Sequence, residues 1–241
     1  MTNPTAAMLV IGDEILSGRT RDINANVLAV ELTAKGIDLG EVRFVPDVPE
    51  RIISALNALR GAYTHVFTSG GIGPTHDDIT ADCVAEAFGV SVDVRADARA
   101  ILEHYYAEKE VELNAARLRM ARIPDGATLI DNPVSGAPGF GLGNVYVMAG
   151  VPKIFKAMLD GVLAGLSSGR PIESVSLRVE RPEGEVAGPL QAFAADHLDV
   201  AVGCYPFNEG GQLGCNIVMR SSERETLNAL LPELTAKFVD P

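Results

Sequence analysis

The sequence predicts an α/β fold, in which a mostly parallel sheet carries helices on both faces, followed by a small α+β domain. Two observations lead to this prediction: short apolar runs alternate with segments of helical periodicity, and these runs end at polar or glycine-rich loops. Such alternation implies right-handed crossovers between parallel strands, with ligands bound beyond the carboxyl ends of the strands. Hydrophobic residues form 47% of the 241 residues, which is enough to fill a core.

The first region begins with the wholly apolar run 7–12, which stops at a polar cluster as a buried parallel strand does. Residues 22–34 predict a helix, because apolar side chains recur at helical spacing, Asp22 is a suitable N-cap and Gly36 lies just beyond the end. The later elements follow from the same signals: strand 37–45, helix 49–59, strand 65–69, helices 78–88, 96–109 and 114–123, a loop over 125–143, an apolar run over 144–149 and a helix from 150 to 166.

The second region follows residues 167–171, which have the composition of a linker. We therefore place one domain at 1–168 and a second at 172–241. The second predicts, in order, strand 173–179, helix 186–197, strands 200–205 and 215–220, and helix 223–238. A small α+β domain is the simplest account of this order.

Composition limits the partners and the compartment. The net charge of −12 argues against nucleic acid, because no basic stripe offsets the repulsion of a phosphate backbone. The three cysteines are widely spaced and predict neither a disulfide framework nor a zinc site. The sequence shows no signal peptide and no apolar run of about 18 residues, so we expect a cytoplasmic protein without a membrane partner. We also expect a homo-oligomer, with dimer and trimer both open.

The glycine-rich turn 69–75 (SGGIGPT) follows the strand predicted at 65–69. Its glycines permit positive φ angles and a close approach of ligand to main chain, while Pro74 stiffens the turn. Successive amides can then converge on an anion, and a helix that begins near Asp77 or Asp78 would add its positive dipole end. We expect a phosphate or pyrophosphate group here, in contact with Ser69, Gly70, Gly71, Gly73, Pro74 and Thr75.

Asp77 and Asp78 place two carboxylates beside the expected anion, and a divalent metal such as Mg²⁺ would remove this conflict. Hard cations are held by one or two carboxylates together with substrate phosphate oxygens, and they polarise the P–O bond. An alternative of equal weight is that Asp78 caps the helix, with Thr80 in its first turn. Both are possible, with one aspartate in each role.

Two further loops are expected near the same edge of the sheet. Residues 11–26 offer Ser17 and Asn24 to a ligand, and Asp13 or Glu14 as a metal ligand or as a base on water. An acidic surface loop with a helix cap is the alternative for this stretch. Residues 132–141 would close over the ligand, although loops rich in Gly and Pro are more often plain connections. The candidate contacts in this second loop are Asn132, Ser135, Pro138 and Gly139.

Several familiar motifs are missing from the sequence. There is no GxxxxGK[ST] and no complete GxGxxG, which argues against a P-loop NTPase and against a dinucleotide-binding Rossmann site. There is no GxSxG elbow, and the four histidines show no HExxH or other paired spacing. The glycine turn therefore remains the strongest chemical signal.

Taken together, the segments resemble the molybdopterin-binding, MoaB/MogA-like domain family, in the branch of the competence/damage-inducible CinA proteins. The resemblance spans about residues 7–166 and rests on IGDEILSGRTRDINAN, SGGIGPTHDDIT, NAARLRMARIP, NPVSGAPGF and VYVMAGVP, in this order. Residues 200–207, ahead of a polar hairpin, are similar to the small KH-like second domain of those proteins. That topology need not bind RNA, because no GxxG loop with basic flanks is present.

The resemblance implies chemistry at an activated phosphate. It associates the CinA branch with hydrolysis of ADP-ribose and the molybdenum-cofactor branch with adenylylation of molybdopterin. By matching motif positions, phosphate contacts would come from Gly70, Gly71, Gly73 and Thr75, a metal would lie on Asp77 or Asp78, and the other wall would hold Asp13, Glu14 and Asn24.

The sequence leaves three functions open for a small phosphate-bearing nucleotide or pterin ligand. The first is metal-dependent hydrolysis of a nucleotide pyrophosphate such as ADP-ribose, with Asp78, Glu14 and Asp13 as catalytic candidates. The second is molybdopterin binding or adenylylation. The third is a binding module that senses a nucleotide without turnover.

Overall fold

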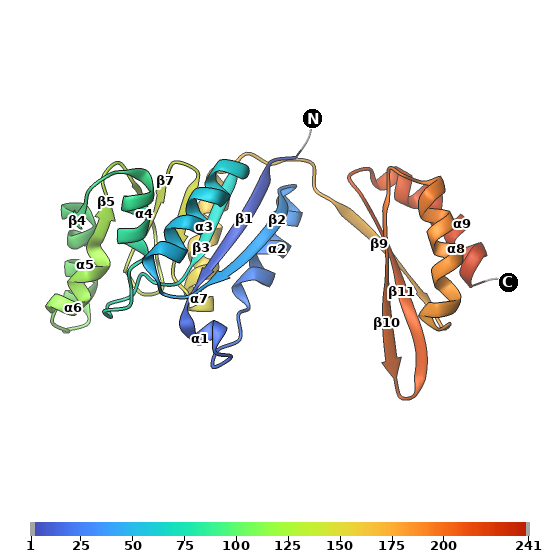
Figure 1. Cartoon of the computed structure of the whole chain (residues 1–241), viewed down its shortest axis with the longest axis horizontal. Helices are drawn as coiled ribbons and strands as arrows, with labels where there is room; N and C mark the ends of the chain where they lie inside the picture. Colours follow the sequence, from blue (N-terminus) through green and yellow to red (C-terminus); the bar gives the residue numbers. More distant parts are fainter. Residues whose placement is uncertain (1–2, 240–241) are drawn as a thin grey trace. The chain divides into compact units, whose positions relative to one another are not determined.

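A six-stranded sheet forms the centre of residues 1–169 in the computed structural model, which describes residues 3–239 (Figure 1). Its strands are β1 (Thr5–Ile11), β2 (Asp38–Val45), β3 (His65–Ser69), β6 (Thr128–Ile130), β7 (Gly139–Leu142) and β8 (Val145–Met148). The order is β2-β1-β3-β8-β7-β6; the first four strands are parallel, while β7 runs antiparallel to both of its neighbours. The expected fold class, a mostly parallel sheet, is confirmed.

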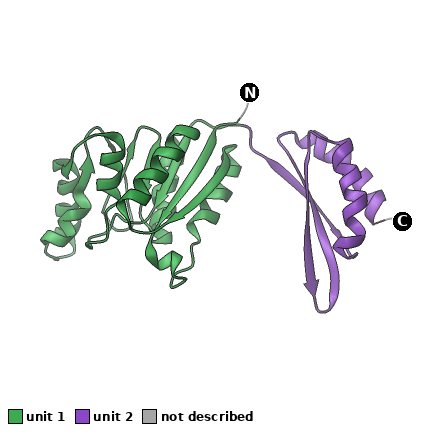
Figure 2. Ribbon diagram, in the orientation of Figure 1, with its two compact units in different colours: residues 1–169 green, residues 170–241 purple. Residues whose placement is uncertain are grey.

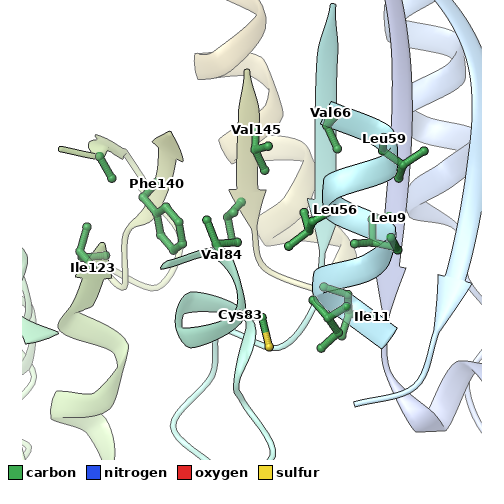
Figure 3. Packing of buried hydrophobic residues seen from close by; sticks show 14 of the residues in the cluster. Leu9, Ile11, Leu56, Leu59, Val66, Cys83, Val84, Ile123, Phe140 and Val145 are labelled. Carbon is green, nitrogen blue, oxygen red and sulfur yellow. The ribbon is translucent and has the colours of Figure 1, made fainter. Parts of the chain in front are cut away.

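Helices cover both faces of this sheet (Figure 1). They are α1 (Asp13–Leu16), α2 (Asn24–Lys35), α3 (Pro49–Ala62), α4 (Thr80–Phe88), α5 (Ala96–Glu108), α6 (Ala115–Leu118), a 3-10 turn η1 (Arg119–Ala121) and α7 (Pro152–Gly165). Leu9 and Leu56 pack in the apolar layer that includes residues of α3 and α4 (Figure 3), whereas Met8 and Phe155 pack in the layer that includes α2 and α7. Because successive residues of β1 face opposite layers, an unbroken apolar run is what this strand requires.

Two segments correct the expectations from sequence. The helix expected over 114–123 is reduced to α6 and η1, and its end belongs to strand β5 (Arg122–Pro124), which pairs antiparallel with β4 (Val92–Val94). The loop expected over 125–143 contains β6 and β7. A Cβ atom on Gly139 would lie 2.3 Å from the carbonyl oxygen of Val147, so glycine there permits close strand packing.

Residues 170–241 form a second unit that is described by itself (Figure 2). Its elements are β9 (Glu173–Val179), α8 (Glu183–Asp196), β10 (Ala201–Glu209), β11 (Gln212–Ser221) and α9 (Arg224–Phe238). The strands form an antiparallel sheet with the order β10-β11-β9, and buried residues such as Phe193, Ile217 and Leu234 pack the helices against it. In the described part of the chain, none of the helices has both the length and the apolar character that crossing a membrane requires.

Candidate functional site

A pocket of about 470 Å³ lies where β3 and β8 end. Ser69 and Met148 are paired at the ends of these parallel strands, so the loops that follow both strands leave from the same edge of the sheet. The pocket is lined by the glycine turn from Gly70 to Pro74 and by residues 149–152, which follow β8. The structure thus places the turn at the sheet edge that the sequence predicted for it.

The backbone of the turn requires glycine at two positions. Gly70 and Gly71 have φ angles of 106° and 67°, a region that residues with a Cβ atom rarely adopt. A Cβ on Gly70 would also lie 2.2 Å from the carbonyl oxygen of Ile11. Thr80, the first residue of α4, donates from its hydroxyl to Gly70 O and from its amide to Gly71 O, each at 3.0 Å. Thr80 therefore holds the carbonyl groups of the turn in place.

The amides of Gly71, Ile72 and Gly73 donate no hydrogen bond to any residue in the described range 3–239. By contrast, Gly70 N donates to Met148 O at 3.2 Å, and Thr75 N donates to Asp78 Oδ2 at 2.8 Å. Not every amide of the turn 69–75 is therefore available to an anion, because the amides of Gly70 and Thr75 already donate to acceptors in the protein. Consecutive backbone N–H groups of this kind form anion-binding concavities.

Asp78 folds back onto the turn instead of capping α4. The helix begins at Thr80, with Ile79 at the N-cap and no side-chain cap, so both the expected helix start at Asp78 and its capping role are wrong. Thr75 Oγ1 lies 2.6 Å from Asp78 Oδ2 and 2.5 Å from Asp77 Oδ1, which brings both carboxylates to one hydroxyl group. The Thr75 hydroxyl lowers the pKa of Asp77. Only Asp78 of the two lines the pocket.

The loop after β1 contributes Glu14 to the pocket wall, whereas Asp13 is not among the lining residues. Asp13 N donates to Asp47 Oδ2 at 2.9 Å. Burial raises the pKa of Asp47, and the negative charges of Asp13, Glu14 and Asp77 add to this effect. Asp47 lies two residues after the end of β2 and was missed from sequence, where it reads as part of the connection to the helix opened by Pro49. A carboxylate just after a predicted strand is the signal that would have found it.

Asn24 and Ser69 line a smaller cavity that adjoins the pocket and shares Glu14 and Gly150 with it. The Asn24 side chain is 3% exposed, and its Nδ2 donates to Ser69 Oγ and to Gly150 O, each at 2.8 Å. These bonds tie α2 to the end of β3 and to the loop after β8. Asn24 Oδ1 is buried and has no hydrogen-bond partner among the described residues, so it is the atom that a ligand or water would satisfy.

Asn132 shapes the loop that was expected to close over the ligand. Its Oδ1 accepts from the amides of Val134 and Ser135, while its Nδ2 donates to Ser135 Oγ and Ala137 O at 2.7 Å. All of these bonds are internal to the loop. Asn132 and Ser135 both line the pocket, which places the loop at the site as expected.

Six of the predicted ligand contacts do not line this pocket. Asn24 and Ser69 line the adjoining cavity, and Thr75 is not among the lining residues of the pocket. Ser17 is exposed, and its hydroxyl donates to Glu14 O at 3.3 Å. Pro138 borders a smaller adjoining cavity, and Gly139 is a buried residue of β7. The residues that sequence missed are mostly apolar: Ile72, Met120, Val151 and Ile154 supply an apolar wall. Three of them lie within the quoted family segments, but an apolar side chain there carries no chemical signal, so only their position after folding reveals them as part of the wall.

The chain shares its first part with a known domain family. Residues 7–167 match the family described as "Probable molybdopterin binding domain", and residues 171–240 match the family described as "FAD synthase, middle domain". The crystal structure of the protein CinA, of unknown function, from Thermoplasma acidophilum is 32% identical, with a TM-score of 0.61 over 67% of this chain and 97% of that one.

Two curated relatives extend this result. A CinA-like protein of Citrifermentans bemidjiense is 38% identical over 168 residues, which cover 68% of this chain and 41% of that protein. A probable FAD synthase of Caenorhabditis elegans is 30% identical over 254 aligned positions, covering 95% of this chain and 49% of that protein. The chain thus spans only part of both relatives. By its matched domain and these likenesses, the chain belongs to the CinA-like molybdopterin-binding family.

Proposed function

We propose that the pocket binds a nucleotide pyrophosphate, such as ADP-ribose, and that the protein hydrolyses it with the help of a divalent metal. A nucleotide-related function is what the two matched families indicate together. The observation that supports the proposal best is the row of unpaired amides at Gly71, Ile72 and Gly73, which border the same pocket as Asp78 and Glu14. Amides of this kind bind phosphate oxygens.

The shape of the pocket suits the two ends of such a ligand. Ile72, Met120, Val151 and Ile154 offer apolar surface for a base or another planar ring, while the turn offers hydrogen-bond donors for the phosphates. Ligand pockets commonly combine an apolar lining with a few placed polar groups, and volumes of about 300–1,000 Å³ are typical. Asn24, which lines the adjoining cavity, has a buried Oδ1 atom that would accept from a ligand hydroxyl or from a water.

The residues present fit a divalent metal in part. Among the described residues, no group of three or more His, Cys, Asp or Glu side chains is arranged to hold an ion. Asp77 and Asp78 nevertheless converge on Thr75 Oγ1 and supply the oxygen donors that Mg²⁺ prefers, with phosphate oxygens of the ligand completing the set. When bound, such an ion would neutralise charge on the phosphates and polarise the P–O bond.

The protein's own groups have distinct roles in this proposal. The amides of the turn orient the pyrophosphate, and Glu14 accepts a proton from the attacking water because its side chain lines the pocket. The water oxygen bonds to one phosphorus, and the bridging oxygen leaves with the other phosphate group. The products of ADP-ribose would be AMP and ribose 5-phosphate. Asp13 would act indirectly, through the Asp47 contact that fixes the start of α1.

Incubation of the purified protein with ADP-ribose and Mg²⁺, Mn²⁺ or Co²⁺ tests the proposal, with AMP release as the measurement. FAD belongs in the same assay, because it contains a pyrophosphate and the Caenorhabditis elegans relative is named as a probable FAD synthase. The variants Asp78→Asn and Glu14→Gln should release much less AMP. Release that both variants retain in full would refute the assigned roles, and no release from either substrate would refute hydrolysis.

Molybdopterin binding is the second candidate, favoured by the family that residues 7–167 match. The same unpaired amides would hold the phosphate of the pterin, and the apolar wall would contact its ring. Fluorescence of a pterin that remains with the protein through purification would support this function. Thermal stabilisation by ADP-ribose without AMP release would instead indicate a binding module, because a ligand of the native state raises its stability.

A further inference from the structure

Arg119 and Arg122 both border a small cavity next to the glycine turn, but their charges are paired differently. Arg122 makes a bidentate ion pair with Asp82, at 2.8 and 2.5 Å. Arg119 makes no ion pair with a carboxylate of the described chain, and the only hydrogen bond of its side chain there runs from Nη2 to Asp78 O at 3.4 Å. The charge of Arg122 is thus paired within the protein, whereas the charge of Arg119 has no carboxylate partner among the described residues.

The unpaired state of Arg119 is costly for the free protein. Its Nε is buried and has no hydrogen-bond partner among the described residues. Leaving a charged donor without a partner in a desolvated position destabilises a native structure, so such groups call for an explanation. Partners are not scarce in this chain, which has 32 acidic residues and 20 basic ones. A ligand that brings its own negative charge would explain why Arg119 remains unpaired.

The position of Arg119 points to the same ligand as the turn. The cavity that it borders shares Gly71, Ile72, Gly73 and Asp78 with the large pocket, so Arg119 lines the same cavity as the residues with unpaired amides. Its positive charge would offset part of the repulsion that an anion meets near Asp78, whose carbonyl oxygen Arg119 contacts. Arginine suits this task because its planar fork of donors matches phosphate oxygens.

We propose that Arg119 binds a phosphate group of the ligand held by the glycine turn. The inference rests on the proposed function only in that the ligand carries phosphate, and it requires no hydrolysis. Because the cation is part of the protein, phosphate binding should persist without a metal. Arg119 is then a binding residue whose loss weakens affinity.

Calorimetric titration with ADP-ribose and with inorganic pyrophosphate, both in buffer containing EDTA, tests this directly. Arg119→Gln should weaken binding of both by about tenfold or more, the scale of one charge-assisted hydrogen bond, while Arg119→Lys keeps part of the affinity. The matched control is Arg117→Gln, which removes the same charge from the same segment. Arg117 lies over the Tyr106 ring and donates to Glu112 O, so its loss should leave binding unchanged.

The unfolding temperature of each ligand-free variant separates binding from a purely structural role. The proposal expects Arg119→Gln to unfold at or above the wild-type temperature, because a buried unpaired donor is removed. It is overturned if Arg119→Gln binds pyrophosphate as wild type does, if it weakens binding only together with a clear fall in unfolding temperature, or if the wild type binds neither probe in EDTA. Binding that depends on Arg119 without AMP release would refute the proposed hydrolysis and leave this inference standing.

Discussion

Replacing Gly71 by alanine tests whether Thr80 holds the glycine turn in shape. A Cβ on Gly71 would lie 2.1 Å from Thr80 Oγ1, and the φ angle there is +67°. Gly89 provides a matched control, because its φ is also +67° and a Cβ on it meets nothing within 4 Å. Both substitutions carry the left-handed backbone penalty of about 1–2 kcal/mol. Only Gly71→Ala also displaces the Thr80 hydroxyl.

The additional cost of Gly71→Ala follows from the hydrogen bond that the displacement breaks. Thr80 Oγ1 donates to Gly70 O at 3.0 Å in a buried position, and leaving such an acceptor unpaired costs about 1–3 kcal/mol. We therefore expect Gly71→Ala to lower the free energy of unfolding by about 2 kcal/mol more than Gly89→Ala does. The variant should also lose affinity for ADP-ribose, because the amides at residues 71–73 shift with the turn.

Urea unfolding followed by circular dichroism measures the stability difference, and hydrogen exchange of peptides from β1 and β3 assigns it to residues 1–169. A double-mutant cycle with Thr80→Ala sharpens the test, because Oγ1 is then absent and the extra cost of Gly71→Ala should largely vanish. Equal destabilisation by Gly71→Ala and Gly89→Ala would refute the role given to Thr80. So would a Gly71→Ala cost that Thr80→Ala leaves unchanged.

Three further predictions concern groups around the site. Burial raises the pKa of Asp47 in the folded protein, so its protonation stabilises the fold below the unfolded pKa, and this stability is lost as the pH rises through the folded pKa. Asp47→Asn should therefore raise the unfolding temperature at pH 7 but not at pH 3. A gain of equal size at both pH values would contradict this. Asn132→Ala removes four hydrogen bonds within the loop, so hydrogen exchange of residues 132–137 should speed up by tenfold or more. Unchanged exchange would show that the loop does not depend on Asn132. Burial raises the pKa of Cys83 to about 12, so iodoacetamide at pH 8 should leave this thiol unmodified until the protein unfolds. Mass spectrometry of the Cys83 peptide measures the labelling. Rapid labelling in the native state would contradict the burial of Cys83.

A helix or strand could be predicted from the sequence when its own residues show the pattern typical of that element. The strands β1 and β3 were expected because buried parallel strands appear as unbroken apolar runs. The strands β6 and β7 were missed because they are three and four residues long, and the glycines of β7 resemble a loop until the close approach of β8 is known. Short strands of this kind owe their structure to pairing with distant segments, which propensity does not report.

The residues of the candidate site also differ in how far the sequence alone could predict them. The glycine turn was expected because backbone geometry demands glycine locally, as the φ angles of Gly70 and Gly71 show. Asn24 was also expected at the site, but its amide ties Ser69 to Gly150, a role that depends on the start of α2, the end of β3 and the loop after β8 coming together. Arg119 was expected in a helix, and only its position beside the turn without a carboxylate partner marks it as a candidate contact. Pairing between distant segments was again the missing information.

The acidity of this sheet edge constrains how an anion can bind there. Burial is the main cause of the raised pKa of Asp47, and the negative charges of Asp13, Glu14 and Asp77 add to it, so these carboxylates act on one another across the ends of β1, β2 and β3. A phosphate group that enters the pocket meets this repulsion, and backbone amides, which carry only partial charges, offset little of it. A full positive charge is therefore needed, either from Arg119 or from a metal on the aspartates. If both act, removal of the metal should weaken binding much more in Arg119→Gln than in the wild type, because the variant then has no cation left at the site.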